Sequence, residues 1–261
     1  MSKEVKVLFL GTSACDFAES LKNEHKNVFD KNARRSSSLL INGTTLIDCG
    51  FHTYNSLVIS KSDISKIDDI VITHTHDDHF YIETLEKIIS CNEGKTINLW
   101  VRDDAKIPEI KNINVKRMEL FKRYEIKDEL FVTGMRANHN QRTYPQHLLF
   151  EAGEKKLFYG CDGAWMIMDT YYALHNMKLD MMVLDGTVGN IEGDYRIFEH
   201  NSIPMIKIMV PSFKKFGIID EKSNVYISHI APSLHKEHSE IENELKDVGV
   251  KVAFDGLEVT L

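Results

Sequence analysis

Residues 74–79 have the sequence His74-Thr75-His76-Asp77-Asp78-His79, which puts three imidazoles and two carboxylates into six positions. The residues before it, 69–73, form a short β-branched apolar run that predicts a buried strand. The end of a strand holds a first ligand rigidly, and the following loop can fold later ligands around the same centre. Imidazole and carboxylate groups without a thiolate are typical of sites for Zn, Mn or Fe. We therefore expect a metal centre where this strand ends.

The spacing within this stretch favours two centres. His74 and His76 are two positions apart, so an extended backbone points both side chains to the same side. Asp78 and His79 are adjacent and point apart, which suits a second centre. The alternative is a polar loop whose histidines are solvated, and that would be the default for a single histidine. The whole pattern directly after a strand rarely arises without a metal.

Further residues of the metal-ligating types follow other predicted strands. We predict strands at 44–47, 126–134, 156–159, 179–184 and 225–228, and each runs into a polar residue at or soon after its C-terminal end: Asp48, His139, Asp162, Asp185 and His229. Taken alone, a histidine in such a place is more often structural, and an aspartate is more often a turn residue. Their occurrence together, each after a predicted strand, argues against a purely structural role for all of them.

This order of residues resembles the signature of the metallo-β-lactamase fold hydrolases: His-x-His-x-Asp-His after a strand, then a His, an Asp and a final His. The resemblance implies two divalent metal ions, Zn or Mn with Fe as a further option. It implies that Asp162 bridges the ions through its two oxygens. The ligand sets that it implies are His74, His76, His139 and Asp162 for the first ion, and Asp78, His79, Asp162 and His229 for the second.

Two more carboxylates are expected just outside the metal ligands. In the resembling family, an aspartate at the position of Asp48 accepts a hydrogen bond from a ligating histidine, and such a contact fixes the histidine tautomer. The alternative for Asp48 is a turn carboxylate that caps a helix beginning near His52. Asp185 is expected to support the site in the same way.

The family fold is an αββα sandwich of the α/β class, in which two mixed β-sheets lie face to face with helices outside. The sequence agrees, because hairpin-rich runs of strands are separated by helices predicted near 80–91, 165–177, 199–209 and 235–247. Asn42-Gly43 predicts a tight hairpin, and residues 252–259 predict a closing hairpin. No linker or repeat divides the chain, so residues 1–261 are predicted to form a single domain.

Composition limits the classes of function. The formal net charge is −7 over 261 residues, which argues against a protein whose main task is to grip a nucleic-acid backbone. The four cysteines, Cys15, Cys49, Cys91 and Cys161, form no C-x-x-C pair and indicate no disulfide framework. The N-terminus has no signal-peptide pattern, and no apolar run approaches the length of a membrane span. We expect a cytoplasmic protein with no membrane contact.

Segments outside the metal ligands resemble one branch of the family. Residues 183–187, 200–202, 227–231 and 254–259 are similar to the PhnP-type phosphoribosyl cyclic phosphodiesterases, relatives of tRNase Z. Members of this branch often carry a cysteine cluster in the region that corresponds to residues 11–35, where this chain has only Cys15. The loop at 14–37 thus departs from the pattern, and its role stays open. No basic arm for gripping tRNA is present.

The resemblance implies hydrolysis of a small cyclic phosphodiester or nucleotide-like substrate. A hydroxide bridging the two metals would be the nucleophile, with Asp78 and His200 as the catalytic residues and His200 as proton donor to the leaving oxygen. His200 could instead be an exposed residue at the start of a helix. The other options are a lactone or thioester hydrolase of the same fold and a metal-binding scaffold without turnover. A homodimer is left open.

Substrate contacts are expected from the N-terminal region. Arg34 and Arg35 form its most basic pair, and guanidinium groups bind phosphate bidentately. The alternative is a solvated or salt-bridged surface pair. Ser13 ends the Gly-Thr-Ser segment after the strand predicted at 5–10, where the chain makes either a tight turn or an array of N–H groups at the mouth of the site.

Overall fold

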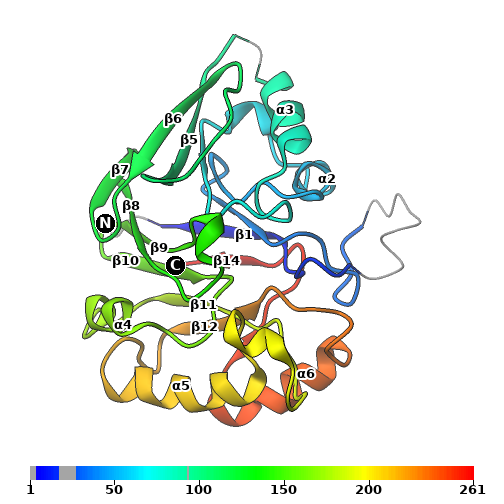
Figure 1. Ribbon diagram of the computed structural model, residues 1–261, viewed down its shortest axis with the longest axis vertical. Coiled ribbons are helices and arrows are strands. Elements are labelled where there is room, and N and C mark those ends of the chain that lie inside the picture. The colour runs from blue at the N-terminus through cyan, green and yellow to red at the C-terminus, as the bar shows by residue number, and fades with distance from the viewer. Residues whose placement is uncertain (1–3, 18–27, 93) are drawn as a thin grey trace.

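The computed structural model describes residues 4–17, 28–92 and 94–261, and two seven-stranded β-sheets lie between helices (Figure 1). Residues 1–3 of the N-terminal segment and residues 18–27 of the predicted 14–37 loop lie outside the described part. In the described part, no helix is both long enough and apolar enough to cross a membrane.

The first sheet contains the N-terminal strands together with the last strand of the chain. Its pairing is antiparallel from β14 to β3 and parallel from β3 to β6, so the sheet is mixed. Its strands, in order across the sheet, are β14 (Glu258–Thr260), β1 (Lys6–Gly11), β2 (Ser38–Ile41), β3 (Thr45–Ile47), β4 (Asp69–Val71), β5 (Ile97–Arg102) and β6 (Ile113–Met118).

The second sheet is built in the same way from the C-terminal half. It is parallel from β13 to β10 and antiparallel from β10 to β7. Its strands, in order, are β13 (Lys251–Val252), β12 (Asn224–Ser228), β11 (Met181–Asp185), β10 (Lys155–Gly160), β9 (Gln146–Ala152), β8 (Leu130–Arg136) and β7 (Arg123–Lys127).

Three apolar clusters hold the layers together. The central cluster contains residues of both sheets, such as Phe9 and Tyr159, and lies between them. The other two lie on the outer faces, where helices cover each sheet (Figure 1). Alternation along β11 illustrates this, because Met181 and Val183 belong to the central cluster and Met182 belongs to an outer one.

Helices cover both outer faces. The helices beside the first sheet are α2 (Thr53–Ile59) and α3 (Ile82–Ser90), and those beside the second are α4 (Met168–Leu174), α5 (Ile203–Lys215) and α6 (His238–Leu245). Short 3-10 turns occupy Ile64–Lys66, Gln141–Thr143, Tyr195–Phe198 and Lys246–Val248. The predicted αββα sandwich with two mixed sheets is therefore confirmed.

Two local predictions are wrong. The residues 252–259 do not form a closing hairpin, because β13 pairs with β12 in the second sheet and β14 pairs with β1 in the first. The helix predicted at 199–209 begins later, at Ile203, where the Ser202 side chain accepts a hydrogen bond from the Met205 N–H and caps it. His200 consequently lies in a loop between the Tyr195–Phe198 turn and α5, where tertiary contacts set its position.

Candidate metal centre

The predicted ligands come together because the strands that carry them end near one another. His74 follows β4, His139 follows β8, Asp162 follows β10 and His229 follows β12. Asp162 and His229 both have a left-handed backbone, with φ of 55° and 58°, within two residues of the ends of their strands. Such a conformation is uncommon outside glycine, and it recurs at functional sites.

The first group of ligand atoms is His74, His76, His139 and Asp162. Asp162 Oδ2 lies 3.1 Å from His74 Nε2 and 3.7 Å from His139 Nε2. His76 Nδ1 lies 2.9 Å from His74 Nε2 and 3.2 Å from His139 Nε2. These are the four residues of the first predicted set, and their ligand atoms all lie within 4.8 Å of one another.

The second group is Asp78, His79, Asp162 and His229. His79 Nε2 lies 3.2 Å from His229 Nε2, 3.3 Å from Asp162 Oδ2 and 3.4 Å from Asp78 Oδ2. Asp162 is therefore common to both groups. Its Oδ2 atom approaches both groups, whereas its Oδ1 atom lies 2.8 Å from His229 Nδ1.

The donor set fits divalent metal ions. Facing ring nitrogens 2.9–3.2 Å apart can share at most one proton for each pair. Burial lowers the pKa of His74 well below its usual range and also lowers that of His139, so both present lone pairs. Burial would raise the pKa of Asp162, but His229 and His79 outweigh it and hold that pKa well below its usual range. A cation between these atoms satisfies lone pairs that otherwise face one another in the interior.

Two buried carboxylates orient histidines around the cluster. Asp48 Oδ2 lies 2.7 Å from His79 Nδ1, and both Asp48 oxygens accept hydrogen bonds from the Thr73 hydroxyl. This contact leaves His79 Nε2 to face the cluster. The helix-capping alternative for Asp48 has no support, because α2 begins after His52 without a side-chain cap.

Asp185 binds the segment that carries His200. Its Oδ2 atom lies 2.8 Å from His200 Nδ1, and its Oδ1 atom accepts hydrogen bonds from the N–H groups of Thr187 and Asn201. The His200 ring stacks on that of His229, with ring centroids 5.5 Å apart and an interplanar angle of 14°. With Nδ1 engaged, the free ring nitrogen of His200 is Nε2. Asp162, Asp185, His200 and His229 form a third group of ligand-type atoms.

Known structures with the same arrangement of elements identify the fold. The chain superposes on the metallo-β-lactamase fold protein YhfI from Bacillus subtilis with a TM-score of 0.77 at 14% sequence identity, over 100% of both chains. The chain has the metallo-β-lactamase fold. The resemblance carried by the sequence motifs and the observed architecture therefore indicate the same fold.

Other solved metallo-β-lactamase-fold structures are similar to this chain. A diphosphatase of the PhnP family has a TM-score of 0.74 at 18% identity, over 100% of this chain and 98% of its own. Zinc-bound PqqB from Methylobacterium extorquens has a TM-score of 0.73 at 16% identity, over 98% of this chain and 100% of its own. A family model described as anti-Pycsar protein Apyc1 matches residues 5–108. No curated protein sequence matches the chain.

The two groups of ligand-type residues lie beside a small cavity of about 110 Å³. It reaches the ligands His76, Asp78, His139, Asp162 and His229. The rest of its lining is Ala14, Cys15, Asp16, Thr187, Arg196, Glu199, His200 and Ala231. Larger cavities lie elsewhere, including one of about 320 Å³ beside Arg34, but none of the metal ligands lines that one.

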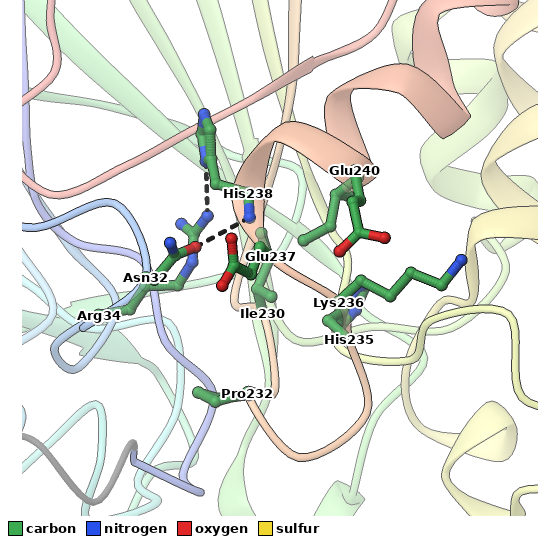
Figure 2. Close-up of a pocket in the computed structure, with 10 residues that line it drawn as sticks. Asn32, Arg34, Ile230, Pro232, His235, Lys236, Glu237, His238 and Glu240 are labelled. Atoms are coloured by element: carbon green, nitrogen blue, oxygen red, sulfur yellow. Dashed lines mark hydrogen bonds between the residues drawn. The ribbon is translucent and has the colours of Figure 1, made fainter.

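The predicted substrate contacts are not in this cavity. Arg34 is buried, and its guanidinium donates to Thr12 Oγ1 and to the Ala253 carbonyl. The same guanidinium contacts His238 Nδ1 (Figure 2). The backbone N–H of Arg35 donates to Asp255, and its guanidinium lies 3.6 Å from the same carboxylate. Ser13 is buried, and its N–H donates to the Arg35 carbonyl. All three residues are therefore engaged by buried contacts. Those of the arginines include residues of the C-terminal segment, which are Ala253 and His238 for Arg34 and Asp255 for Arg35.

Sequence reasoning missed the residues that do line the cavity beside His200. Arg196 and Glu199 belong to the segment between β11 and α5, and Thr187 lies just after β11. The Thr187 hydroxyl lies 2.8 Å from His229 Nδ1 and 3.1 Å from His200 Nδ1. A signal was available for Arg196, because a basic residue lies four positions before His200 in the segment that returns to the site.

Proposed function

We propose that this chain is a metal-dependent phosphodiesterase that hydrolyses a small cyclic phosphodiester or nucleotide-like substrate of the PhnP type. The observation that carries the proposal is His200. It lies against two ligand groups that share Asp162, and Asp185 fixes its ring. Hydrolysis of an alkyl phosphodiester needs a proton for the leaving alkoxide, and a histidine beside the metal ligands is suited to give it.

The ligand residues would hold two divalent ions, Zn or Mn, with Fe as a further option. Such ions supply a hydroxide near neutral pH and neutralise the phosphoryl oxygens. Asp78 and Asp162 contribute the carboxylate ligands, and Asp48 keeps His79 in the tautomer that presents Nε2. Asp185 and Thr187 orient His200 so that its Nε2 atom is available to the leaving oxygen.

The lining of the cavity favours a phosphodiester over an acyl substrate. A lactone or thioester hydrolase needs a pocket for its acyl chain, and among the described residues this lining includes Ala14 and Ala231 but no larger aliphatic side chain and no Phe, Tyr or Trp. Arg196 on the same lining suits an anion. A PhnP-family diphosphatase and yeast PDE1, the latter at 10% identity and a TM-score of 0.70, are among the proteins that share the fold. Their presence is in keeping with the proposal.

A turnover screen tests the proposal. The purified protein would be loaded with Zn or Mn, its metal content measured, and its activity assayed on bis(p-nitrophenyl) phosphate, cyclic nucleotides, a lactone and a thioester. We expect hydrolysis of the phosphodiesters, lost on chelation and restored by metal. Hydrolysis confined to the lactone or thioester would replace the proposal with an acyl hydrolase. Full metal loading without turnover of any substrate would favour a scaffold.

A further inference from the structure

Arg196 is the only lysine or arginine on the lining of the metal-site cavity in the described part of the chain. It belongs to the 3-10 turn Tyr195–Phe198, and its side chain is 35% exposed. Its backbone carbonyl accepts hydrogen bonds from the N–H groups of Glu199 and His200. The turn therefore fixes the spacing between Arg196 and the histidine that contacts the metal ligands.

Asp194 holds one edge of the Arg196 guanidinium. Asp194 Oδ2 accepts from Arg196 Nη1 at 2.9 Å, while its Oδ1 accepts from the Arg196 backbone N–H at the same distance. The Asp194 carboxylate therefore holds both the backbone and the side chain of Arg196. Guanidinium is a planar fork with five N–H donors, so a single carboxylate oxygen leaves most of them for another acceptor.

The other charged residues on the cavity lining limit which group can accept hydrogen bonds from Arg196. Asp16 and Glu199 also belong to the lining, and both are acidic. A second phosphate on the substrate would have to approach these carboxylates, and like charges repel. The cavity therefore suits an anion that carries one negative charge, located between the metal ligands and Arg196.

We propose that Arg196 is the residue that binds the phosphoryl group of the substrate, and that it selects a diester with one phosphate over one with two. This rests on the proposed phosphodiesterase function and supplies the substrate contact that Arg34 and Arg35 do not. Arg196 donates hydrogen bonds to a phosphoryl oxygen whose bond to phosphorus stays intact during the reaction. Asp194 holds the guanidinium in place at the cavity.

The test compares Arg196→Gln and Arg196→Lys with the unmodified protein, all metal-loaded to the same content. Bis(p-nitrophenyl) phosphate is the turnover probe, and inorganic phosphate is the binding probe, measured by calorimetry. Losing a hydrogen bond to a charged group should lower kcat/KM and weaken phosphate binding by about 10- to 100-fold in Arg196→Gln. Arg196→Lys keeps the charge without the fork and should recover part of the loss.

Arg136→Gln is the matched control. Arg136 is also a half-exposed arginine paired with an aspartate, Asp169, at 3.4 Å, but it does not line the cavity. It should leave kcat/KM and phosphate binding unchanged. In the unmodified protein, a cyclic nucleotide should be turned over much faster than ADP-ribose, which carries two phosphates.

The outcomes separate the two proposals. If the unmodified protein hydrolyses phosphodiesters and Arg196→Gln matches it in kcat/KM and phosphate binding, Arg196 has no such role. Faster turnover of ADP-ribose than of the cyclic nucleotide would overturn the selection for one phosphate. If the unmodified protein hydrolyses no phosphodiester, the proposed function itself fails. An equal loss of kcat/KM and phosphate binding in Arg196→Gln and Arg136→Gln would mean that removing either positive charge has the same effect. That result would overturn the inference.

Discussion

Asp162 is the one residue whose ligand atoms belong to both predicted metal sites. Its buried carboxylate lies among His74, His79, His139 and His229, which come from three different segments of the chain. Asp78, by contrast, contacts only His79 and His229 of the second site. Single residues of the same chemical type therefore differ in how many ions they can hold.

We expect Asp162→Ala to weaken both metal sites and to abolish activity, and Asp78→Ala to empty chiefly the second. A shared carboxylate cannot be lost from one ion alone. Metal titration followed by elemental analysis of each variant measures the two occupancies. Two fully occupied sites in Asp162→Ala would show that it is not shared between ions.

His200 gives a second prediction about a single residue. If it protonates the leaving oxygen, His200→Ala should keep both metals and lose about 10²- to 10⁴-fold in kcat on an alkyl phosphodiester. The loss should shrink for bis(p-nitrophenyl) phosphate, because p-nitrophenolate leaves without a proton. Steady-state rates on both substrates make the comparison. An equal loss on both would assign His200 to phosphate binding, and no loss would remove it from the mechanism.

Among the elements, the loop that carries the first ligands depends on the segment after β3. Cys49 and Phe80 form a β-bridge, and the Cys49 N–H donates to the His79 carbonyl at 2.6 Å. Gly50 lies so close to the loop that a Cβ atom would meet the Asp78 carbonyl oxygen at 1.8 Å. The absence of a side chain at this position lets the ligand loop lie against β3.

Gly50→Ala should therefore displace the loop at Asp78 and weaken the second metal site by about 10-fold or more, as losses of supporting contacts do. Gly43→Asn is the control, because Gly43 has nothing within 4 Å of a Cβ atom and asparagine tolerates its φ of 73°. Metal affinity and thermal unfolding would be measured for both. Unchanged metal affinity in Gly50→Ala would mean that the loop adjusts without moving its ligands.

At the scale of the whole molecule, Asp255 connects the C-terminal segment to the N-terminal region through hydrogen bonds. Its Oδ1 accepts from the Thr12 hydroxyl, and its Oδ2 accepts from the Arg35 N–H. Burial raises the pKa of Asp255 to about 6, although Arg34 and Arg35 oppose the shift. A carboxyl group with a raised pKa in the folded state contributes stability below its unfolded pKa and loses it as the pH rises through the folded pKa.

The upward shift of the Asp255 pKa on folding determines how stability changes with pH. Relative to Asp255→Asn, the unmodified protein should lose stability between pH 4 and pH 7, by about 3 kcal/mol over the full titration, from a shift of about two units. Urea unfolding of both proteins across this range measures the difference. A difference that stays constant with pH, or that grows in favour of the unmodified protein, would contradict the shift.

The sequence determined which strand ends carry residues of the ligand types, and its resemblance to the metallo-β-lactamase fold hydrolases implied the sandwich fold and the grouping of those residues. The strand ends could be predicted because the apolar pattern that marks a strand is local in the sequence. His74, Asp162 and His229 are separated by many residues, yet each occurs at a strand end that the sequence marks. The Asn42-Gly43 hairpin was also predictable, and β2 and β3 do pair antiparallel around it.

Only the tertiary structure decided which arginine lines the cavity and where the last strands pair. Arg34 and Arg35 carry the same guanidinium group as Arg196, but both are buried. Arg35 contacts Asp255, 220 positions away, and Arg34 contacts Thr12, Ala253 and His238. β14 likewise pairs with β1 from the beginning of the chain, whereas β13 pairs with the preceding strand, β12, so the last two strands join different sheets. Contacts between segments so far apart depend on how the layers pack, and no local pattern of residues encodes that.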